Sequence, residues 1–214
     1  MSIIGIDEAG RGPVIGPLVL CGVQLQDNLN DKLLEMGVKD SKQLTKKKRE
    51  FLFDLIKSTV EKFHMVIITP EQLDEMMGKG INLNEIESNA SVEIMQNLDA
   101  DVAYIDCPST NIQKYSDVLK AKLKKKIKII AEHKADENYV SVGAASVLAK
   151  VTRDREIEKL HEEFGDFGSG YPSDPKTKAF VEKNSQKYPK LFRHYWEPWL
   201  REFNKKIQKR LGDF

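Results

Sequence analysis

The chain has 214 residues, of which 40% are hydrophobic and 31% are charged, and its formal net charge is +1. This length suits one domain with at most a small appendage, and the composition is that of a globular protein rather than a disordered one. The two cysteines, Cys21 and Cys107, form no CxxC pair, which argues against a zinc site or a disulfide framework. No run of about 18 apolar residues is present, so we expect a cytoplasmic protein without a membrane span.

The predicted elements begin with two strands and continue with alternating helices and strands. Residues 2–6 and 18–25 are β-prone, and the short loop between them predicts an antiparallel pair. Thr45 is a good cap for a helix over 46–63. The other predicted strands are 64–69, 102–106 and 127–132, and the other predicted helices are 30–36, 70–78, 84–98, 111–123, 136–164, 175–187 and 196–211.

This order of elements predicts an α/β fold with a mixed five-stranded sheet, helices on both faces and a helical C-terminal appendage. The loop 165–174 contains three glycines and a proline, which is typical of a boundary between structural regions. We therefore expect a main domain over residues 1–172 and a helical extension over 173–214.

Basic residues gather in separate stretches, including 39–49 and 120–128, whereas the acidic residues of interest lie elsewhere. A nearly neutral protein with this distribution could bind both a polyanion and metal ions. A solvated helix face explains any single basic stretch equally well.

Acidic residues follow three of the predicted strands. They are Asp7, Asp106 and Asp136, and Glu8 adds a fourth carboxylate. Ligands commonly bind just beyond the carboxyl ends of strands in α/β sheets, and clustered carboxylates need a cation to neutralise them. Hard oxygen ligands select Mg²⁺ or Mn²⁺. The simplest alternative is that each aspartate belongs to a turn or a cap, and Asp136 could simply cap its helix.

The loop after the first predicted strand carries a GxGxxxG pattern formed by Gly10, Gly12 and Gly16. A dinucleotide-binding loop is disfavoured because an Asp-Glu pair precedes it, two prolines interrupt it, and a strand follows where that motif needs a helix. Backbone groups of residues 10–12 could instead read a ribose 2′-hydroxyl, which distinguishes RNA from DNA. Arg11 could hold a phosphate or support the loop.

Six stretches of the chain match the motifs of one enzyme family in the family's order. They are IGIDEAGRGPVIGPLV at 4–19, KDSKQL at 39–44, YIDCPS at 104–109, HKAD at 133–136, AASVLAKVTRD at 144–154 and GSGYPSDPKT at 168–177. The sequence thus resembles type 2 ribonuclease H (ribonuclease HII) in its archaeal form. The resemblance implies a ribonuclease H-like fold for the catalytic domain, with C-terminal helices that help to grip the substrate.

The resemblance also implies an activity and a set of metal ligands. The activity would be hydrolysis of the RNA strand of RNA–DNA hybrids and cleavage 5′ of ribonucleotides embedded in DNA, with 3′-hydroxyl and 5′-phosphate ends. The ligands of two Mg²⁺ or Mn²⁺ ions would be Asp7, Glu8, Asp106 and Asp136. We expect Asp7 and Asp106 to be shared between the metals, because their strands are neighbours in this fold.

Substrate-binding residues follow from the same resemblance. They are Gly10, Arg11, Gly12, Lys42, Ser146, Lys150 and Tyr171. The loop from Gly10 to Gly12 would recognise the ribose at an RNA–DNA junction, and Tyr171 would pack on the sugar of the following deoxynucleotide. Lys42 would contact a substrate phosphate, while Ser146 and Lys150 would support the backbone or the site.

The chain departs from the family's pattern in two places. The family often has a proline after Tyr139 and a serine at position 143, where this chain has Gly143, and we expect a looser helix around Ser146. The tail contains Trp196 and Trp199, which would lie on one helical face. We expect them to pack that helix onto the core, and stacking on nucleic-acid bases is the alternative.

Two other functions are the alternatives to a ribonuclease H. A nuclease of the same fold that cuts DNA would need no 2′-hydroxyl, and a non-catalytic hybrid-binding module would not need four acids. His133 is a candidate general base, although a structural histidine is the simpler interpretation.

The expected partners are RNA–DNA hybrids and DNA containing ribonucleotides, and we expect the protein to be a monomer. The tail shows no obvious motif for a replication clamp, so that contact is left open.

Overall fold

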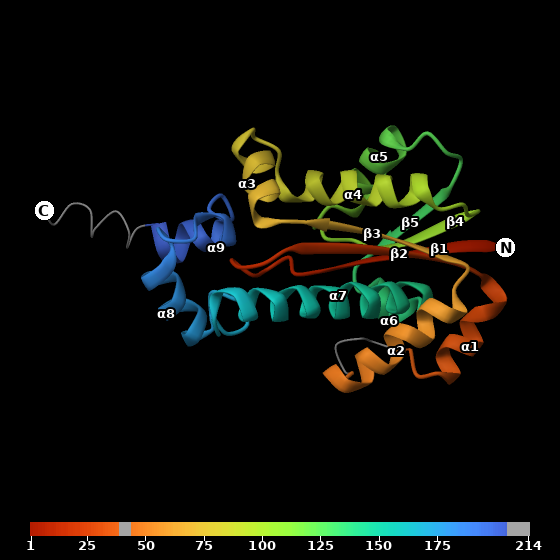
Figure 1. Ribbon diagram of the computed structural model, residues 1–214. Coiled ribbons are helices and arrows are strands. Elements are labelled where there is room, and N and C mark those ends of the chain that lie inside the picture. Colours follow the sequence, from red (N-terminus) through yellow and green to blue (C-terminus); the bar gives the residue numbers. More distant parts are fainter. Residues whose placement is uncertain (39–43, 205–214) are drawn as a thin grey trace, which may run out of the picture. The chain divides into compact units, whose positions relative to one another are not determined.

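The computed structural model describes residues 1–38 and 44–204, and Figure 1 shows how its helices and strands are arranged. The strands are β1 (Ser2–Ala9), β2 (Leu18–Gln26), β3 (Lys62–Ile68), β4 (Val102–Asp106) and β5 (Lys128–Glu132). The helices are η1 (Asp27–Leu29), α1 (Asn30–Glu35), α2 (Lys46–Thr59), α3 (Pro70–Gly78), α4 (Leu83–Asn97), α5 (Ile112–Lys122), α6 (Ala135–Asn138), α7 (Val140–Phe164), α8 (Pro175–Asn184), η3 (Pro189–Leu191), α9 (Glu197–Trp199) and η4 (Leu200–Asn204).

The strands form one mixed sheet in the order β3-β2-β1-β4-β5, which confirms the predicted five-stranded sheet. β1 pairs with β2 in antiparallel fashion, and it pairs with β4 in parallel, with Ile6 opposite Ile105. β4 and β5 are also parallel, with Asp106 opposite Glu132. The carboxyl ends of β1, β4 and β5 therefore lie at the same edge of the sheet.

Helices cover both faces of this sheet, as predicted. Figure 1 shows α1, α2, α6 and the first half of α7 on one face, and α4 and α5 on the other. The predicted cap at Thr45 is present, because Thr45 accepts a hydrogen bond from the Lys48 amide at 3.2 Å. Thr69 and Gln72 form a reciprocal capping box at the start of α3.

The chain divides into two compact units, each built from separate segments. Unit 1 comprises residues 1–9, 19–67 and 83–152, and unit 2 comprises residues 10–18, 68–82 and 153–214. The core of unit 1 joins apolar residues of the sheet, such as Val23, to Leu52 of α2 and Leu148 of α7. The core of unit 2 is aromatic, with Phe167, Phe192 and Trp199 among its members. The predicted boundary between residues 172 and 173 stays a prediction.

Tertiary contacts shorten two predicted helices. The helix predicted over 46–63 ends at Thr59, because the Glu61 amide donates to the Gln24 carbonyl at 2.9 Å and the chain turns into β3. The helix predicted over 136–164 is interrupted at Tyr139, which is extended. The Tyr139 ring stacks on Tyr104 at 4.1 Å between centroids, and its hydroxyl donates to Glu132 at 2.7 Å. Helical periodicity does not show such long-range contacts.

The helix predicted over 196–211 is present as α9 and η4 as far as Asn204, and Trp196 is its N-cap. Trp199 is 3% exposed and Trp196 packs against the same core, as predicted. Residues 205–211 lie outside the described part of the chain.

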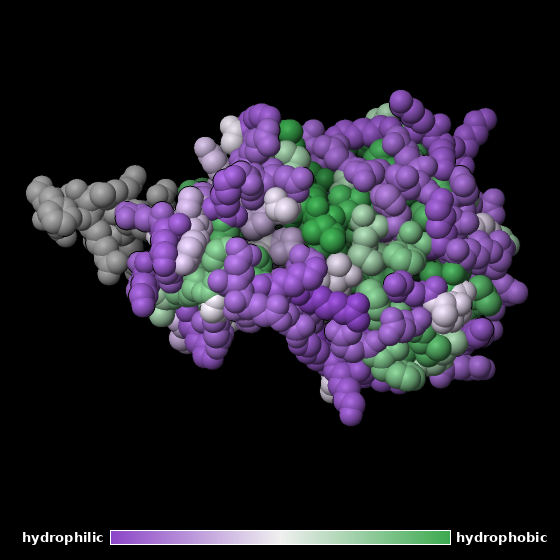
Figure 2. Space-filling view, in the orientation of Figure 1, coloured by the Kyte–Doolittle hydropathy of each residue, from purple (hydrophilic) through white to green (hydrophobic). Residues whose placement is uncertain are grey.

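Hydrophilic residues cover most of the face of the molecule that Figure 2 shows. Within residues 1–38 and 44–204, no helix is both long and apolar enough to cross a bilayer. Cys21 and Cys107 are buried free thiols, in agreement with the expected absence of a disulfide.

Candidate functional site

Asp106 is the last residue of β4, and Asp7 lies two residues before the end of the neighbouring parallel strand β1, which runs beyond its predicted end at Ile6. Ile6 and Ile105 are paired in register, so the next residues, Asp7 and Asp106, project to the same face of the sheet. Asp7 is 4% exposed. The Ala135 amide donates to Asp106 Oδ1 at 3.1 Å, which links this carboxylate to the start of α6.

The first half of α7 places a serine and a lysine beside Asp7. Lys150 Nζ lies 3.9 Å from Asp7 Oδ2 and donates to Ser146 Oγ, and Ser146 hydrogen-bonds to Asp7. Burial raises the pKa of Asp7 to about 7, and the Asp106 carboxylate adds to this effect. Lys150, Ser146 and the Glu8 amide oppose the rise in pKa. Asp7 is therefore a carboxylate whose negative charge is only partly compensated.

Glu8 points to the opposite face of the sheet, as alternation along a strand requires. Burial raises the pKa values of Cys107 and Tyr115, and the nearby negative charge of Glu8 is a further cause for both. Tyr115 belongs to α5, which covers the face of the sheet opposite α7. The two adjacent acids thus sit at one edge of the sheet but on different sides of it.

Asp136 is held in the first turn of α6 by a strained connection after β5. Lys134 precedes this helix with φ of 58°, the one left-handed non-glycine residue in the described ranges. This conformation directs the Ala135 amide toward Asp106 and buries Asp136, which is 3% exposed. The Tyr139 contacts fix the other end of α6. The connection therefore ties the positions of Asp106 and Asp136 together.

Substitutions at Lys134 test this strained connection. Lys134→Val should lower the free energy of unfolding by about 1–2 kcal/mol, because a β-branched residue strongly disfavours positive φ. Lys134→Gly, which removes the same exposed side chain but accepts this φ, should be at least as stable as the parent protein. Urea titration of the three proteins measures the difference. Equal stability of the valine and glycine variants would contradict the assigned conformation.

The donor set fits a hard divalent cation. All four predicted ligands are carboxylates, and a cation would offset both the burial of Asp7 and its repulsion from Asp106. Within residues 1–38 and 44–204, no three His, Cys, Asp or Glu side chains already stand close enough to form a metal site. The site therefore has suitable ligands at the sheet edge but not a closed coordination shell.

His133 is anchored to the backbone beside this edge. Its Nδ1 lies 3.1 Å from the Cys107 carbonyl, so an Nδ1–H donates there. The Cys107 amide in turn donates to the Glu132 carbonyl at 2.8 Å. This bond fixes the orientation of the ring, and it is compatible with both interpretations of His133.

The glycine-rich loop belongs to unit 2, where it meets the loop that carries Tyr171. Gly10 has φ of +86°, and a Cβ there would lie 2.5 Å from the Pro17 carbonyl oxygen, so only glycine fits. A Cβ on Gly12 would lie 3.0 Å from Tyr171 Cε1. Val14 and Ile15 both donate to the Gly170 carbonyl. The structure therefore brings Gly12 and Tyr171 together, 40% of Tyr171 being exposed.

Two arginines that the sequence did not single out support these loops. Arg153 Cζ lies over the Tyr171 ring, 5.7 Å from the ring centroid, in a cation–π contact. Arg153 Nη2 also donates to the Ser169 carbonyl at 3.1 Å. Arg193 is 2% exposed and donates to the carbonyls of Arg11 and Gly16. Arg153 stands three residues after Lys150 in a matched motif, whereas Arg193 lies in the tail outside the motifs. Lys42, the predicted phosphate contact, lies outside the described residues.

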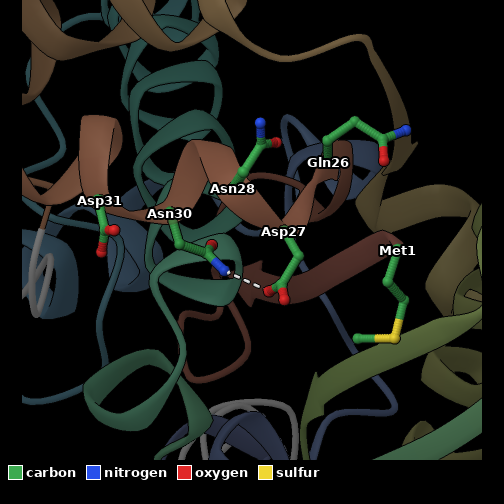
Figure 3. A pocket seen from close by; sticks show the side chains of 6 residues that line it. All are labelled: Met1, Gln26, Asp27, Asn28, Asn30 and Asp31. Carbon is green, nitrogen blue, oxygen red and sulfur yellow. Dashed lines mark hydrogen bonds between the residues drawn. The ribbon is translucent and has the colours of Figure 1, made fainter.

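Unit 1 also has an open pocket, and none of the predicted site residues lines it. Figure 3 shows its lining residues, Met1, Gln26, Asp27, Asn28, Asn30 and Asp31. Asn30 Nδ2 donates to Asp27 Oδ1 at 2.9 Å. The pocket lies at the start of β1, about 20 Å along the strand from Asp7 at roughly 3.3 Å per residue. Its two aspartates, with no lysine or arginine in the lining, make it unsuited to a phosphate backbone.

The comparisons with protein families, with related proteins and with solved structures all point to the same enzyme family. The family model described as ribonuclease HII matches residues 4–198. A ribonuclease HII of Methanococcus maripaludis is 51% identical over 203 residues, which cover 91% of this chain and 84% of that protein. The crystal structure of ribonuclease H2 from Pyrococcus horikoshii OT3 has a TM-score of 0.89 at 40% identity and covers 100% of both chains. The structure of the PCNA:RNase HII complex from Archaeoglobus fulgidus has a TM-score of 0.85 at 43% identity and covers 92% of this chain and 96% of that chain. The predicted ribonuclease H-like fold is confirmed.

Proposed function

The chain belongs to the ribonuclease HII family, and from this premise we propose that it cuts hybrids 5′ of ribonucleotides by two-metal-ion catalysis. It is a hydrolase, an endoribonuclease that acts on RNA–DNA hybrids. The finer proposal includes cleavage at ribonucleotides embedded in DNA, with 3′-hydroxyl and 5′-phosphate ends. Such an enzyme would remove misincorporated ribonucleotides and RNA primers.

One observation carries the two-metal proposal. Asp7 is buried beside Asp106 at the carboxyl edge of the sheet, and its pKa is raised to about 7. Asp7 accepts hydrogen bonds from Ser146 and the Glu8 amide, yet its burial outweighs them, and a bound cation would offset that burial. Asp7, Glu8, Asp106 and Asp136 would hold the ions.

Two divalent cations, Mg²⁺ or Mn²⁺, would supply charge stabilisation at the attacking and leaving oxygens of the phosphodiester. Asp7 and Asp106 would both provide carboxylate oxygens to the ions, because they share one face of the sheet. Ser146 would keep the Asp7 carboxylate in one orientation, and Lys150 would compensate part of its charge. Glu8 would reach the ions from around the sheet edge.

Residues of unit 2 would read the sugar. Backbone groups of Gly10, Arg11 and Gly12 would bind the ribose 2′-hydroxyl, and Tyr171 would pack on the next deoxyribose. Gly12 and the Tyr171 ring lie close together. This supports the two roles, because the two residues would contact adjacent sugars. Lys42 would contact a phosphate of the substrate.

A protein partner is also part of the proposal. The Archaeoglobus fulgidus relative was solved in a complex with PCNA, and we extend a clamp contact to this chain on that basis. The expected cytoplasmic location and monomeric state stay predictions.

Three duplexes of one sequence test the proposed function against its rivals. They are an RNA–DNA hybrid, the all-DNA duplex and a DNA duplex with one ribonucleotide. The proposal predicts metal-dependent cleavage of the first and third but not of the second, and no cleavage in EDTA. Cleavage of the all-DNA duplex would favour a DNA nuclease, and binding without cleavage at any metal concentration would favour a non-catalytic module.

Gly12→Ala should impair recognition of the ribose. The added methyl group would lie 3.0 Å from Tyr171 Cε1, so the ring or the loop must shift by a few tenths of an ångström. We expect kcat/KM on the single-ribonucleotide duplex to fall about tenfold or more, since small misplacements are costly in a positioned site. Gly78→Ala is the matched control, because its Cβ would lie 3.3 Å from the ring of Tyr195, outside the site. Equal kcat/KM values for the two variants would contradict the role of Gly12.

A further inference from the structure

We propose that Arg193 is a positioning residue for the glycine-rich loop and that its guanidinium fixes how the Arg11–Gly12 peptide is presented to the ribose. The inference rests on the proposed function of this loop and deepens it. All the contacts that carry it lie within unit 2.

The first observation is the burial of a charged side chain. Arg193 is the largest fully buried side chain in the described part of the chain, with 2% exposure. Removing a guanidinium from water costs much more than burying a methionine of similar length, and an apolar replacement is often neutral or stabilising. A purely structural demand for packing would therefore be met better by an apolar residue. A role that needs several fixed donors accounts for the arginine.

The second observation is where the donors point. Arg193 Nε and Nη2 donate to the Gly16 carbonyl at 2.9 and 2.6 Å, and Nη1 donates to the Arg11 carbonyl at 3.3 Å. One planar group thus spans the two ends of the glycine-rich loop. Arginine suits this task because its donors form a rigid fork.

The backbone of the same segment fixes where this fork stands. The Arg193 amide donates to the Val14 carbonyl at 3.0 Å, and Phe192 forms an antiparallel bridge with Ile15. A neighbouring side chain adds one more contact, as Trp196 Nε1 donates to the Gly12 carbonyl at 3.2 Å. The tail therefore hydrogen-bonds to four carbonyls of the loop, those of Arg11, Gly12, Val14 and Gly16.

The consequence for ligand binding follows from peptide geometry. The described residues contain no cis peptide, and in a trans peptide the carbonyl and the following N–H point in opposite directions. Because the Arg11 carbonyl faces Arg193, the Gly12 N–H points away from Arg193. Arg193 thus sets the direction of an amide donor in the segment that would read the 2′-hydroxyl, while the Gly170 carbonyl holds Val14 and Ile15.

Binding measurements in an Asp7→Asn background test this role without cleavage. The quantity is the ratio of dissociation constants for the all-DNA duplex and the duplex with one ribonucleotide. Arg193→Met should reduce this preference for ribose about tenfold, by analogy with other lost positioning contacts, and Arg193→Lys should restore part of it. The matched control is Arg201→Met, which removes an exposed arginine of the same tail that pairs with Glu197 and should leave the ratio unchanged.

Each outcome decides the inference. An unchanged ratio in folded Arg193→Met, or an equal loss of affinity for both duplexes, would overturn it, because a merely structural residue would not alter the preference. If Arg193→Met does not fold, Arg193→Lys decides, because lysine keeps the charge but lacks the planar fork that reaches the carbonyls of both Gly16 and Arg11; a ratio below that of the parent supports the inference and a ratio equal to it overturns it. If the Asp7→Asn parent shows no preference for ribose, the proposed role of the loop fails and the inference fails with it.

Discussion

Asp7→Asn is expected to abolish hybrid cleavage and, at the same time, to stabilise the metal-free protein above pH 7. The loss of activity should reach about 10³-fold or more, as for other central catalytic groups. The gain in stability has a separate cause. Asp7 is buried, and its pKa lies at about 7 in the folded protein against 3.8 for an unperturbed aspartate. An asparagine removes the charge that burial disfavours.

The pH dependence of this gain has a defined sign. Below about pH 4 the aspartate is protonated in both the folded and the unfolded state, so the substitution should have little effect there. As pH rises toward 7, the unfolded state releases its proton first, and ionisation destabilises the folded state. At pH 8 the difference should be on the order of 2–4 kcal/mol, because one pKa unit corresponds to about 1.4 kcal/mol.

Urea unfolding in EDTA at pH 4 and pH 8 measures this effect. Asp31→Asn is the matched control, because Asp31 is an exposed aspartate on α1. Added Mn²⁺ should stabilise the parent protein but not Asp7→Asn, since only the parent keeps the proposed ligand. Equal stability of Asp7→Asn and the parent at pH 8 would contradict the environment assigned to Asp7.

Gly5→Ala should cause the largest loss of stability among the glycine variants considered. A Cβ on Gly5 would lie 2.1 Å from the carbonyl carbon of Ser141 and 2.4 Å from the Val142 amide nitrogen. These are backbone atoms at the start of α7, so the helix itself must move. We expect a loss of about 3 kcal/mol or more, which is at the upper end for overpacked sites.

The same displacement should reach the active site. α7 carries Ser146 and Lys150, both of which contact Asp7 two residues beyond Gly5. The transition temperature should therefore fall by about 10 °C, and the residual activity at low temperature should fall as well. Gly78→Ala, at a helix end beside the exposed Tyr195, should leave both nearly unchanged. An unaltered transition temperature for Gly5→Ala would show that β1 and α7 do not pack as described.

The sequence alone predicts the sheet and the position of its acids well. The strands that carry Asp7 and Asp106 are recognisable from short apolar runs, and their common edge follows from strand–helix alternation, although β1 continues to Ala9 instead of ending before Asp7. Local patterns fail where a distant contact decides the structure. The break at Tyr139 depends on stacking with Tyr104, which no pattern near residue 139 reveals.

The recognition loops show the same limit. Glycines at 10 and 12 indicate a close backbone approach, but the atom approached, on Tyr171, comes from a distant segment. Arg193 has no motif around it and looks like part of a basic tail. Its guanidinium donates to the carbonyls of Gly16 and Arg11, which lie 177 and 182 positions away in the sequence, and only the folded chain shows that pairing.

Mapping the product ends of a DNA duplex with one ribonucleotide tests metal-dependent cleavage 5′ of that ribonucleotide. With Mg²⁺ or Mn²⁺, we predict a single cut on the 5′ side of the ribonucleotide, a 3′-hydroxyl on the upstream fragment and a 5′-phosphate on the ribonucleotide. Cleavage on the 3′ side of the ribonucleotide, a cyclic phosphate end, or full activity in EDTA would rule out the proposed hydrolysis.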